Sequence, residues 1–256
     1  AMRAAFMIAF DYQDDHPQVA IISPTTILCR QHYMSFVERF KGCDINIGQL
    51  SRLISSAQAK VMKKDIETGK INIVIGTHAL LSKDIKFKNL KLLIIDEEQH
   101  FGVVQKERLK SLKSGVHVLS LSATPIPRTL AMSYYADLDV STIDELPSGR
   151  KPIKTLLINN NRRSEVVGFV EEACKNGAQV YWVCPLIEES EKLDLENAIN
   201  TFLELEKQIQ SIKIGLVHGK LSSAEKASIM EQFSHNQLQV LVATTVIEVG
   251  VDVPNA

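Results

Sequence analysis

Two adjacent carboxylates, Asp96 and Glu97, follow four apolar residues in LLIIDEEQH, the segment from Leu92 to His100. A short apolar run of this kind predicts a buried β-strand, and open α/β sheets bind ligands at the carboxyl ends of their strands. At that edge Asp96 suits a hydrated magnesium ion, and Glu97 suits a general base for an attacking water. The alternative is a solvated acidic turn, and this short pattern alone favours neither.

A second set of candidate side chains follows another apolar run, in LSLSATPIP from Leu119 to Pro127. Ser122 and Thr124 come directly after the predicted strand, so we expect them near the same sheet edge as Asp96. Hydroxyl groups there can relay hydrogen bonds between a nucleotide site and a neighbouring domain. The alternative is a strand end that caps the next helix. The acidic pair on the preceding strand favours the relay.

Short apolar runs alternate with helical patterns along the whole chain, which predicts an α/β fold with mainly parallel sheets. Strands are expected at 18–23, 45–50, 71–75, 92–95, 117–121, 153–158, 180–184, 212–217 and 238–243. Helices are expected in the first fifteen residues, near 56–67, 105–112, 162–175 and 222–233, and over much of 188–210. A further helix is expected after a Thr25 or Thr26 cap, with Leu28, Phe36, Val37 and Phe40 on its apolar face.

The segment DELPSGRKP, Asp144 to Pro152, interrupts this alternation. It combines two prolines, a glycine and charged residues, a composition typical of a linker. We therefore expect a domain boundary near residue 148, with one domain over 1–147 and the other over 148–256.

Composition excludes several classes of protein. The 256 residues include 29 basic and 30 acidic side chains, for a net charge of -1, which excludes a polycation that coats nucleic acid. Hydrophobic residues make up 45%, which is ordinary globular composition and excludes wholesale disorder. No apolar run approaches the about 20 residues of a membrane span, so no membrane partner is expected. The four cysteines lack zinc-ligand spacing and predict reduced thiols in a cytoplasmic protein.

Taken in order, these segments resemble the motifs of superfamily 2 helicases. DEEQ and SATPIPRT resemble motifs II and III, SPTTILCRQH (23–32) resembles motif Ia, and GTHALL (76–81) resembles the DNA-contact motif that follows. VHG (217–219) and VATTVIEVGVDVPNA (242–256) resemble the motif before V and motif V. The resemblance covers essentially the whole chain. It points to the RecG-like DNA helicase and translocase family, which includes branched-DNA helicases and transcription-repair coupling factors.

The two halves resemble different members of that family. The first half is more similar to the coupling factors, and the second half, with YYADLDVSTIDELPSGR and QVYWVCPLIEESEKL, is more similar to the RecG-type helicases. A hybrid sequence and a divergent homologue with both signatures are the two hypotheses.

The resemblance implies two RecA-like domains that bind ATP and magnesium between them, with 1–147 as the ATP-binding domain and 148–256 as the helicase C-terminal domain. It implies that Asp96 helps to bind magnesium indirectly, that Glu97 is the catalytic base, and that Ser122 and Thr124 couple hydrolysis to motion. Three further nucleotide-site assignments concern the motif II remainder and motif V. They are Glu98 and Gln99 in the motif II box, His100 as either a motif III contact or a packing residue, and Gly250 and Asp252 facing the nucleotide.

For DNA, the resemblance and the strand-end positions point to small residues in both domains. Hydroxyls and glycine amides can approach phosphates closely without reading base sequence, which suits a motor that moves on any DNA. These candidates are Thr25, Gly76, Thr77, His218, Gly219, Thr244 and Thr245. Each of them could instead be a cap or turn residue.

The function that the resemblance implies is ATP-dependent translocation on double-stranded or branched DNA, in fork rescue, recombination and repair. The alternative is a coupling-factor motor that displaces a stalled RNA polymerase, which would then be a partner. The family's Walker A loop and motif VI do not occur in these 256 residues, so we expect the 256-residue polypeptide alone to lack ATPase activity. A non-catalytic DNA-binding module is the remaining alternative.

Overall fold

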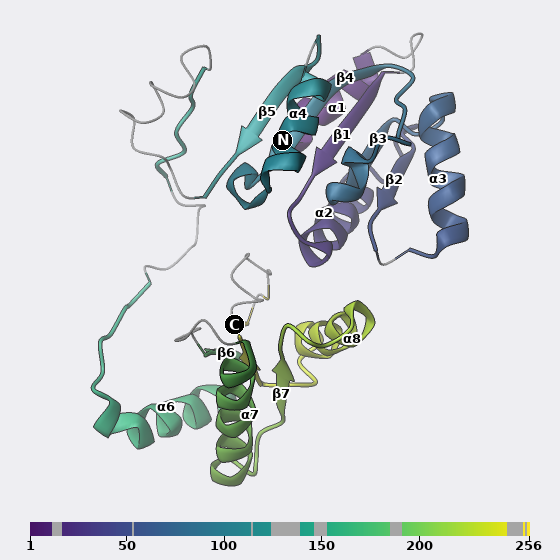
Figure 1. The fold of residues 1–256 in the computed structure, drawn as a ribbon. Helices are drawn as coiled ribbons and strands as arrows, with labels where there is room; N and C mark the ends of the chain where they lie inside the picture. Colours follow the sequence, from purple (N-terminus) through teal and green to yellow (C-terminus); the bar gives the residue numbers. More distant parts are fainter. Residues whose placement is uncertain are drawn as a thin grey trace.

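The computed structural model describes residues 1–11, 17–52, 54–113, 115–123, 139–145, 153–184, 191–244, 253 and 255–256. These residues form two parallel sheets, each with helices on both faces (Figure 1). The predicted α/β fold with mainly parallel sheets is therefore confirmed.

The first sheet has five strands in the order β2-β3-β1-β4-β5, and every neighbouring pair is parallel. Its strands are β1 (Gln18–Ile22), β2 (Ile47–Leu50), β3 (Ile73–Gly76), β4 (Leu90–Asp96) and β5 (His117–Leu121). The α-helices around it are α1 (Met2–Asp11), α2 (Thr26–Arg39), α3 (Ser56–Thr68) and α4 (Val103–Lys113). Two short 3₁₀ helices are η2 (His78–Leu81) and η3 (Glu98–His100).

Alternate residues of the central strand face opposite cores. Val19 and Ile21 of β1 pack in the core that contains α1 and α2, whereas Ala20 and Ile22 pack in the core that contains α3 and α4. Both faces of the sheet are thus covered, which is why the inner strands β1, β3 and β4 read as mostly apolar runs instead of alternating patterns.

The second sheet has three parallel strands in the order β6-β8-β7 among the residues described. They are β6 (Val180–Val183), β7 (Ile214–Val217) and β8 (Val240–Ala243). Its helices are α6 (Arg163–Lys175), which the 3₁₀ helix η4 (Asn160–Arg162) precedes, α7 (Glu191–Gln208) and α8 (Ser223–Ser234). Val240 and Val242 face the core of α6 and α7, and Leu241 faces the core of α8.

Helix caps set where several of these helices begin. The Thr25 hydroxyl accepts a hydrogen bond from the Leu28 amide at 3.3 Å, so Thr25 is the cap of α2. Ser55 and Ser222 begin α3 and α8 with complete capping boxes. A capping box satisfies helix N–H groups that have no partner within the helix.

Two details of the prediction are wrong. Residues 153–158 form no strand, and Leu156 and Leu157 are exposed, because no described strand pairs with this segment. Val37 was expected on the apolar face of α2 but is 40% exposed, while Phe36 is buried. One residue further along a helix is about 100° further around it, which takes Val37 off the narrow buried stripe.

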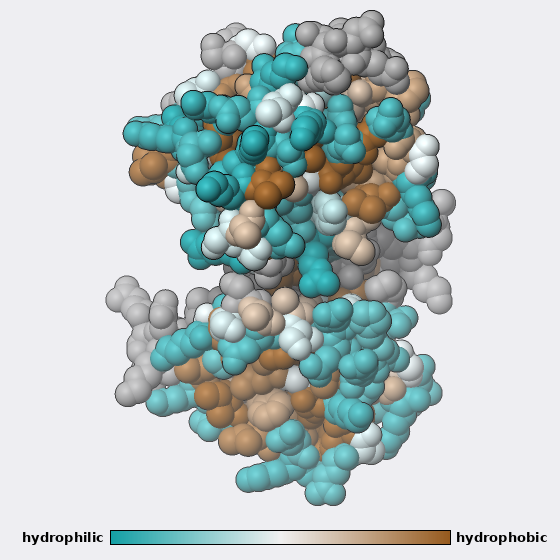
Figure 2. All heavy atoms as spheres, turned by 90° about the vertical axis from the view of Figure 1, so that its right-hand side faces the viewer, coloured by the Kyte–Doolittle hydropathy of each residue, from teal (hydrophilic) through white to brown (hydrophobic). Residues whose placement is uncertain are grey.

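The two halves touch only lightly where the structure describes them. Ile27 of α2 packs against the core cluster that holds Phe233 of α8, and Arg30 lies 4.0 Å from Glu231. Both charged side chains are about half exposed, and such surface pairs contribute little stability. The face in Figure 2 is mostly hydrophilic, with smaller hydrophobic groups in its upper part and a larger hydrophobic area in its lower part, where the second sheet lies.

No helix in the described part of the chain is long and apolar enough to cross a membrane. All four cysteines are free thiols, as predicted. Burial raises the pKa of Cys29 to about 11, so this thiol stays protonated in the core. The boundary near residue 148 stays a prediction, since 146–152 lie outside the described residues.

Candidate nucleotide site

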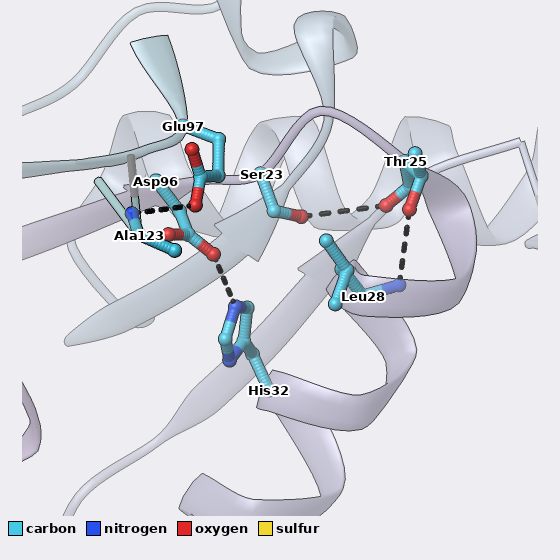
Figure 3. A network of polar contacts seen from close by, with 7 residues as sticks. All are labelled: Ser23, Thr25, Leu28, His32, Asp96, Glu97 and Ala123. Carbon is cyan, nitrogen blue, oxygen red and sulfur yellow. Dashed lines mark hydrogen bonds and ion pairs between the residues drawn. The ribbon is translucent and has the colours of Figure 1, made fainter. Parts of the chain in front are cut away.

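The acidic pair lies at the carboxyl edge of the first sheet, where β4 ends. Leu92 to Ile95 are buried, and Asp96 is the last residue of the strand, opposite Leu121 of β5. The strand leaves the buried core at this point, so the Asp96 side chain is 18% exposed. Figure 3 shows both carboxylates, Asp96 and Glu97, at this strand end.

A histidine from a different helix holds one oxygen of Asp96. His32 lies on α2, and its Nε2 is 2.9 Å from Asp96 Oδ2 (Figure 3). An ionised carboxylate only accepts hydrogen bonds, so Nε2 carries the proton and donates it. Among the described residues, His32 is the only hydrogen-bond partner of the Asp96 carboxylate. His32 was not among the residues predicted for this site, although it falls within the motif Ia segment.

The Glu97 carboxylate is tied to the residues that follow β5. The Ala123 amide donates to Glu97 Oε1 at 2.9 Å (Figure 3). The Ser122 hydroxyl lies 3.4 Å from Glu97 Oε2. Gln99 also donates to Oε2. The structure thus brings Ser122 to Glu97, as the two strand ends predicted. Thr124, the other hydroxyl of this pair, lies outside the described residues.

Glu97 adopts a left-handed backbone conformation, with φ 51° and ψ 55°. This conformation costs a residue other than glycine about 1–2 kcal/mol. It also turns the chain at the end of β4, so that the Glu97 amide donates to Leu121 of β5 at 2.9 Å. Backbone strain of this kind collects at functional sites, where the surroundings hold it in place.

The rest of the motif II box makes weaker contacts. Glu98 accepts a hydrogen bond from the Ser120 hydroxyl at 3.1 Å, and Gln99 lies 3.4 Å from the Ser122 hydroxyl. The His100 side chain is exposed, so the structure does not support the packing interpretation. These residues therefore add a second link between the segments after β4 and β5.

The DNA-contact candidates of the first half differ in exposure. Thr25 is partly exposed beside α2, but its hydroxyl already accepts the capping hydrogen bond. Gly76 and Thr77 are buried, and an added Cβ on Gly76 would lie 2.5 Å from Leu80 Cγ and 2.7 Å from the Leu50 carbonyl oxygen. Packing therefore accounts for the glycine. The Thr77 hydroxyl is buried without a hydrogen-bond partner in the described part of the chain.

The candidates of the second half lie at the ends of β7 and β8. Thr244 is buried, and its amide donates to the Val217 carbonyl at 3.3 Å, which brings the two strand ends together. Gly219 is exposed and its carbonyl accepts from Lys226 at 2.7 Å. Burial, and then the charges of Lys226 and Lys220, lower the pKa of His218. Thr245, Gly250 and Asp252 lie outside the described residues.

A cavity of about 460 Å³ with several basic side chains in its lining lies at the edge of the first sheet, and the sequence did not predict it. Its lining includes Arg52, Lys63, His78 and Arg108, which come from segments far apart in the chain. His78 Nε2 lies 3.5 Å from Arg52, and burial followed by the Arg52 charge lowers the pKa of His78. These basic residues are scattered in sequence, so no run of basic residues indicates them.

Comparisons with known proteins identify the family of this chain. The sequence model of the DEAD/DEAH box helicases matches residues 1–133, and that of the helicase conserved C-terminal domain matches residues 162–256. The ATP-dependent DNA helicase RecG of Haemophilus influenzae is 46% identical over 257 residues, covering 98% of this chain and 37% of that protein. The transcription-repair-coupling factor of Rickettsia bellii is 46% identical over 256 residues, covering all of this chain and 22% of that protein.

Solved structures show the same relationship. A structure of RecG bound to a three-way DNA junction superposes with a TM-score of 0.73 at 39% identity, covering 99% of this chain and 32% of that one. Yeast Dbp5 bound to RNA and ADP BeF3, at 17% identity and a TM-score of 0.69, shares the fold. The chain thus spans about a third or less of the length of the RecG and coupling-factor proteins quoted. With the first family model matching more than half of its residues, this chain belongs to the DEAD/DEAH box helicase family of superfamily 2.

Proposed function

We propose that this chain is the motor core of an ATP-dependent translocase that remodels branched double-stranded DNA, as a RecG-type helicase does. The observation that carries the proposal is the pair Asp96 and Glu97 at the end of β4, with the Glu97 carboxylate held by the Ala123 amide. The RecG relatives, and the likeness to RecG bound to a three-way DNA junction, support branched DNA as the partner.

The chemistry of the donor atoms fits a hydrated magnesium ion at Asp96. Among the described residues its carboxylate accepts one hydrogen bond, to Oδ2, and the side chain is partly exposed, which leaves oxygen lone pairs for magnesium-bound water. In the described residues no three His, Cys, Asp or Glu side chains form a metal cluster. When bound, ATP supplies the phosphoryl group that is cleaved, and magnesium offsets the negative charge of the phosphates.

Glu97 is the residue that we expect to accept a proton from the attacking water. The hydrogen bonds at Oε1 and Oε2 orient the carboxylate. Among the described residues Oε1 accepts the Ala123 amide alone, so it keeps a further lone pair for that proton. Because Ala123 and Ser122 follow β5, a shift of that segment would turn the Glu97 carboxylate away from its working orientation. The network therefore supports the proposed role of Ser122 in coupling hydrolysis to motion.

The test is a comparison of wild type with Glu97→Gln in the protein as its gene encodes it. Glutamine keeps the acceptor oxygen for Ala123 but cannot take a proton, so ATP hydrolysis stimulated by branched DNA should fall by about 100-fold or more. Binding of a fluorescent ATP analogue should stay close to wild type. A protein that hydrolyses no ATP with any DNA, or a Glu97→Gln variant with full activity, would refute the proposal.

A second candidate function is displacement of a stalled RNA polymerase. The equal 46% identity to a coupling factor and to a RecG protein is the observation that favours it. The two functions separate in paired assays with the same protein, one of fork regression and one of the release of a polymerase stalled on DNA. Fork regression without polymerase release supports the RecG-type function, and the reverse result supports the coupling factor.

A further inference from the structure

The contact between His32 and Asp96 joins two elements that are far apart in the chain. Sixty-four positions separate the two residues, and the His32 Nε2 to Asp96 Oδ2 distance is 2.9 Å. The two side chains are 33% and 18% exposed, so the contact is partly shielded from water. A hydrogen bond to an ionised group in such a setting is stronger than one between neutral groups.

Packing of α2 does not explain this contact. The helix is already held on the sheet by apolar side chains, because Cys29 and Phe36 are buried in the core below it and Phe40 follows at its end. Its first turn is closed by the Thr25 cap. The helix is therefore held on the sheet without His32. The hydrogen bond from this half-buried imidazole to the last residue of β4 is not needed to attach α2.

We infer that His32 is a positioning residue for the carboxylate of Asp96, an inference that rests on the proposed nucleotide site. By donating to Oδ2, the imidazole restricts rotation of the carboxylate and leaves Oδ1 for water on a magnesium–nucleotide complex. A hydrogen-bond partner behind a metal-binding group orients that group, and its loss typically weakens metal binding by about 10- to 100-fold. His32 itself need not touch the nucleotide, the metal or the DNA.

Three substitutions at His32 separate the hydrogen bond from the rest of the side chain. His32→Gln can keep an N–H group at the reach of Nε2, and His32→Asn is too short to place one there. His32→Leu removes the donor but keeps a side chain of similar bulk. Met34→Gln, on the same helix and 58% exposed, is the matched control for a change on α2.

The measurement is binding of Mn²⁺, followed by electron paramagnetic resonance, to the protein as its gene encodes it with the ATP analogue AMP-PNP. His32→Leu and His32→Asn should weaken Mn²⁺ binding by about tenfold, the lower end of the usual range because the metal contact runs through water. His32→Gln and Met34→Gln should bind like wild type. In His32→Leu and His32→Asn, the magnesium concentration that gives half-maximal ATPase activity should rise in parallel. The kcat at saturating magnesium should change little.

Thermal unfolding without metal or nucleotide shows which variants fold. Folded His32→Leu and His32→Asn variants that bind Mn²⁺ like wild type would overturn the role of His32. So would a loss of binding in His32→Gln equal to that in His32→Leu. A wild type that binds no Mn²⁺ with AMP-PNP is a different result, since it would refute the proposed nucleotide site itself.

Discussion

Glu97 combines a strained backbone with a carboxylate that is hydrogen-bonded at both oxygens. It and Asn236, with φ of 51° and 56°, are the two non-glycine residues of the described chain with positive φ. Asparagine tolerates this conformation, whereas glutamate has no such preference. The contacts of Glu97 with Leu121 and Ala123 hold the strained turn in place, so the strain and the proposed base coincide at one residue.

Gly76 offers a test that separates packing from DNA contact. Gly76→Ala should destabilise the fold by about 1–3 kcal/mol, because the new Cβ would overlap Leu80 and the Leu50 carbonyl. The matched control is Gly168→Ala within α6, where a Cβ meets nothing within 4 Å and should stabilise by about 0.5–1 kcal/mol. Urea unfolding measures both. If Gly76→Ala keeps full stability but loses DNA affinity, the glycine serves DNA contact instead.

One helix of each half, α3 and α8, begins with the same capping chemistry in two versions. The capping box of α3 pairs Ser55 with Gln58, and that of α8 pairs Ser222 with Glu225. In each box the longer side chain accepts from the serine amide, at 3.0 Å in α3 and 2.8 Å in α8. One box is therefore uncharged and the other ionisable, although their geometry is alike.

This difference predicts that, of the two capping boxes, only the one of α8 contributes a pH-dependent stability. Hydrogen bonds from the Ser222 hydroxyl and backbone lower the pKa of Glu225 below its ordinary value of 4.5. A lowered carboxyl pKa stabilises the fold above the ordinary value, and this stabilisation is lost as the pH falls through the folded value. Glu225→Ala should therefore destabilise at neutral pH, with a cost that shrinks below about pH 4.5.

Gln58→Ala in α3 is the control for that experiment. Its side chain does not titrate, so its cost, measured by the same thermal unfolding series, should not follow the titration of a carboxyl group. Equal pH profiles for Glu225→Ala and Gln58→Ala would contradict the assignment of the effect to Glu225.

The chain as a whole consists of two sheets with separate cores, one from β1 to β5 and the other from β6 to β8. Between them, residues 139–145 and 153–159 have no helix or strand. The described contacts between the halves are few and include the half-exposed pair Arg30 and Glu231. Two cores joined in this way suit a motor whose halves move relative to each other.

Limited trypsin digestion tests the predicted boundary near residue 148. The first cleavage should fall between 139 and 159, for example after the exposed Lys154, and should leave two fragments that resist further digestion. Lys60 is also exposed, but it lies within α3 and should be cut more slowly. Early cuts inside α3, or fragments that are degraded at once, would argue against two independent domains.

Patterns along the chain predicted that the residues at the ends of β4 and β5 lie near one edge of the sheet. The runs that became β1 and β4 are apolar because both sheet faces are buried there, whereas β5 is the outer strand of the described sheet and is partly exposed. The acidic and hydroxyl residues stand at the ends of β4 and β5. The segment 153–158 has the same apolar character yet forms no strand, because a strand also needs a neighbour, which periodicity does not supply.

Local period and strand-end residues are properties of neighbouring positions, so the α/β fold, a cap of α2 at Thr25 or Thr26, and the pair Asp96 and Glu97 can be predicted from the amino acids alone. Contacts between distant positions depend on the order of strands in the sheet and on where each helix crosses it. Only the tertiary structure therefore brings His32 to Asp96 and Ala123 to Glu97. Only the tertiary structure also packs Leu80 so closely against Gly76 that a Cβ has no room.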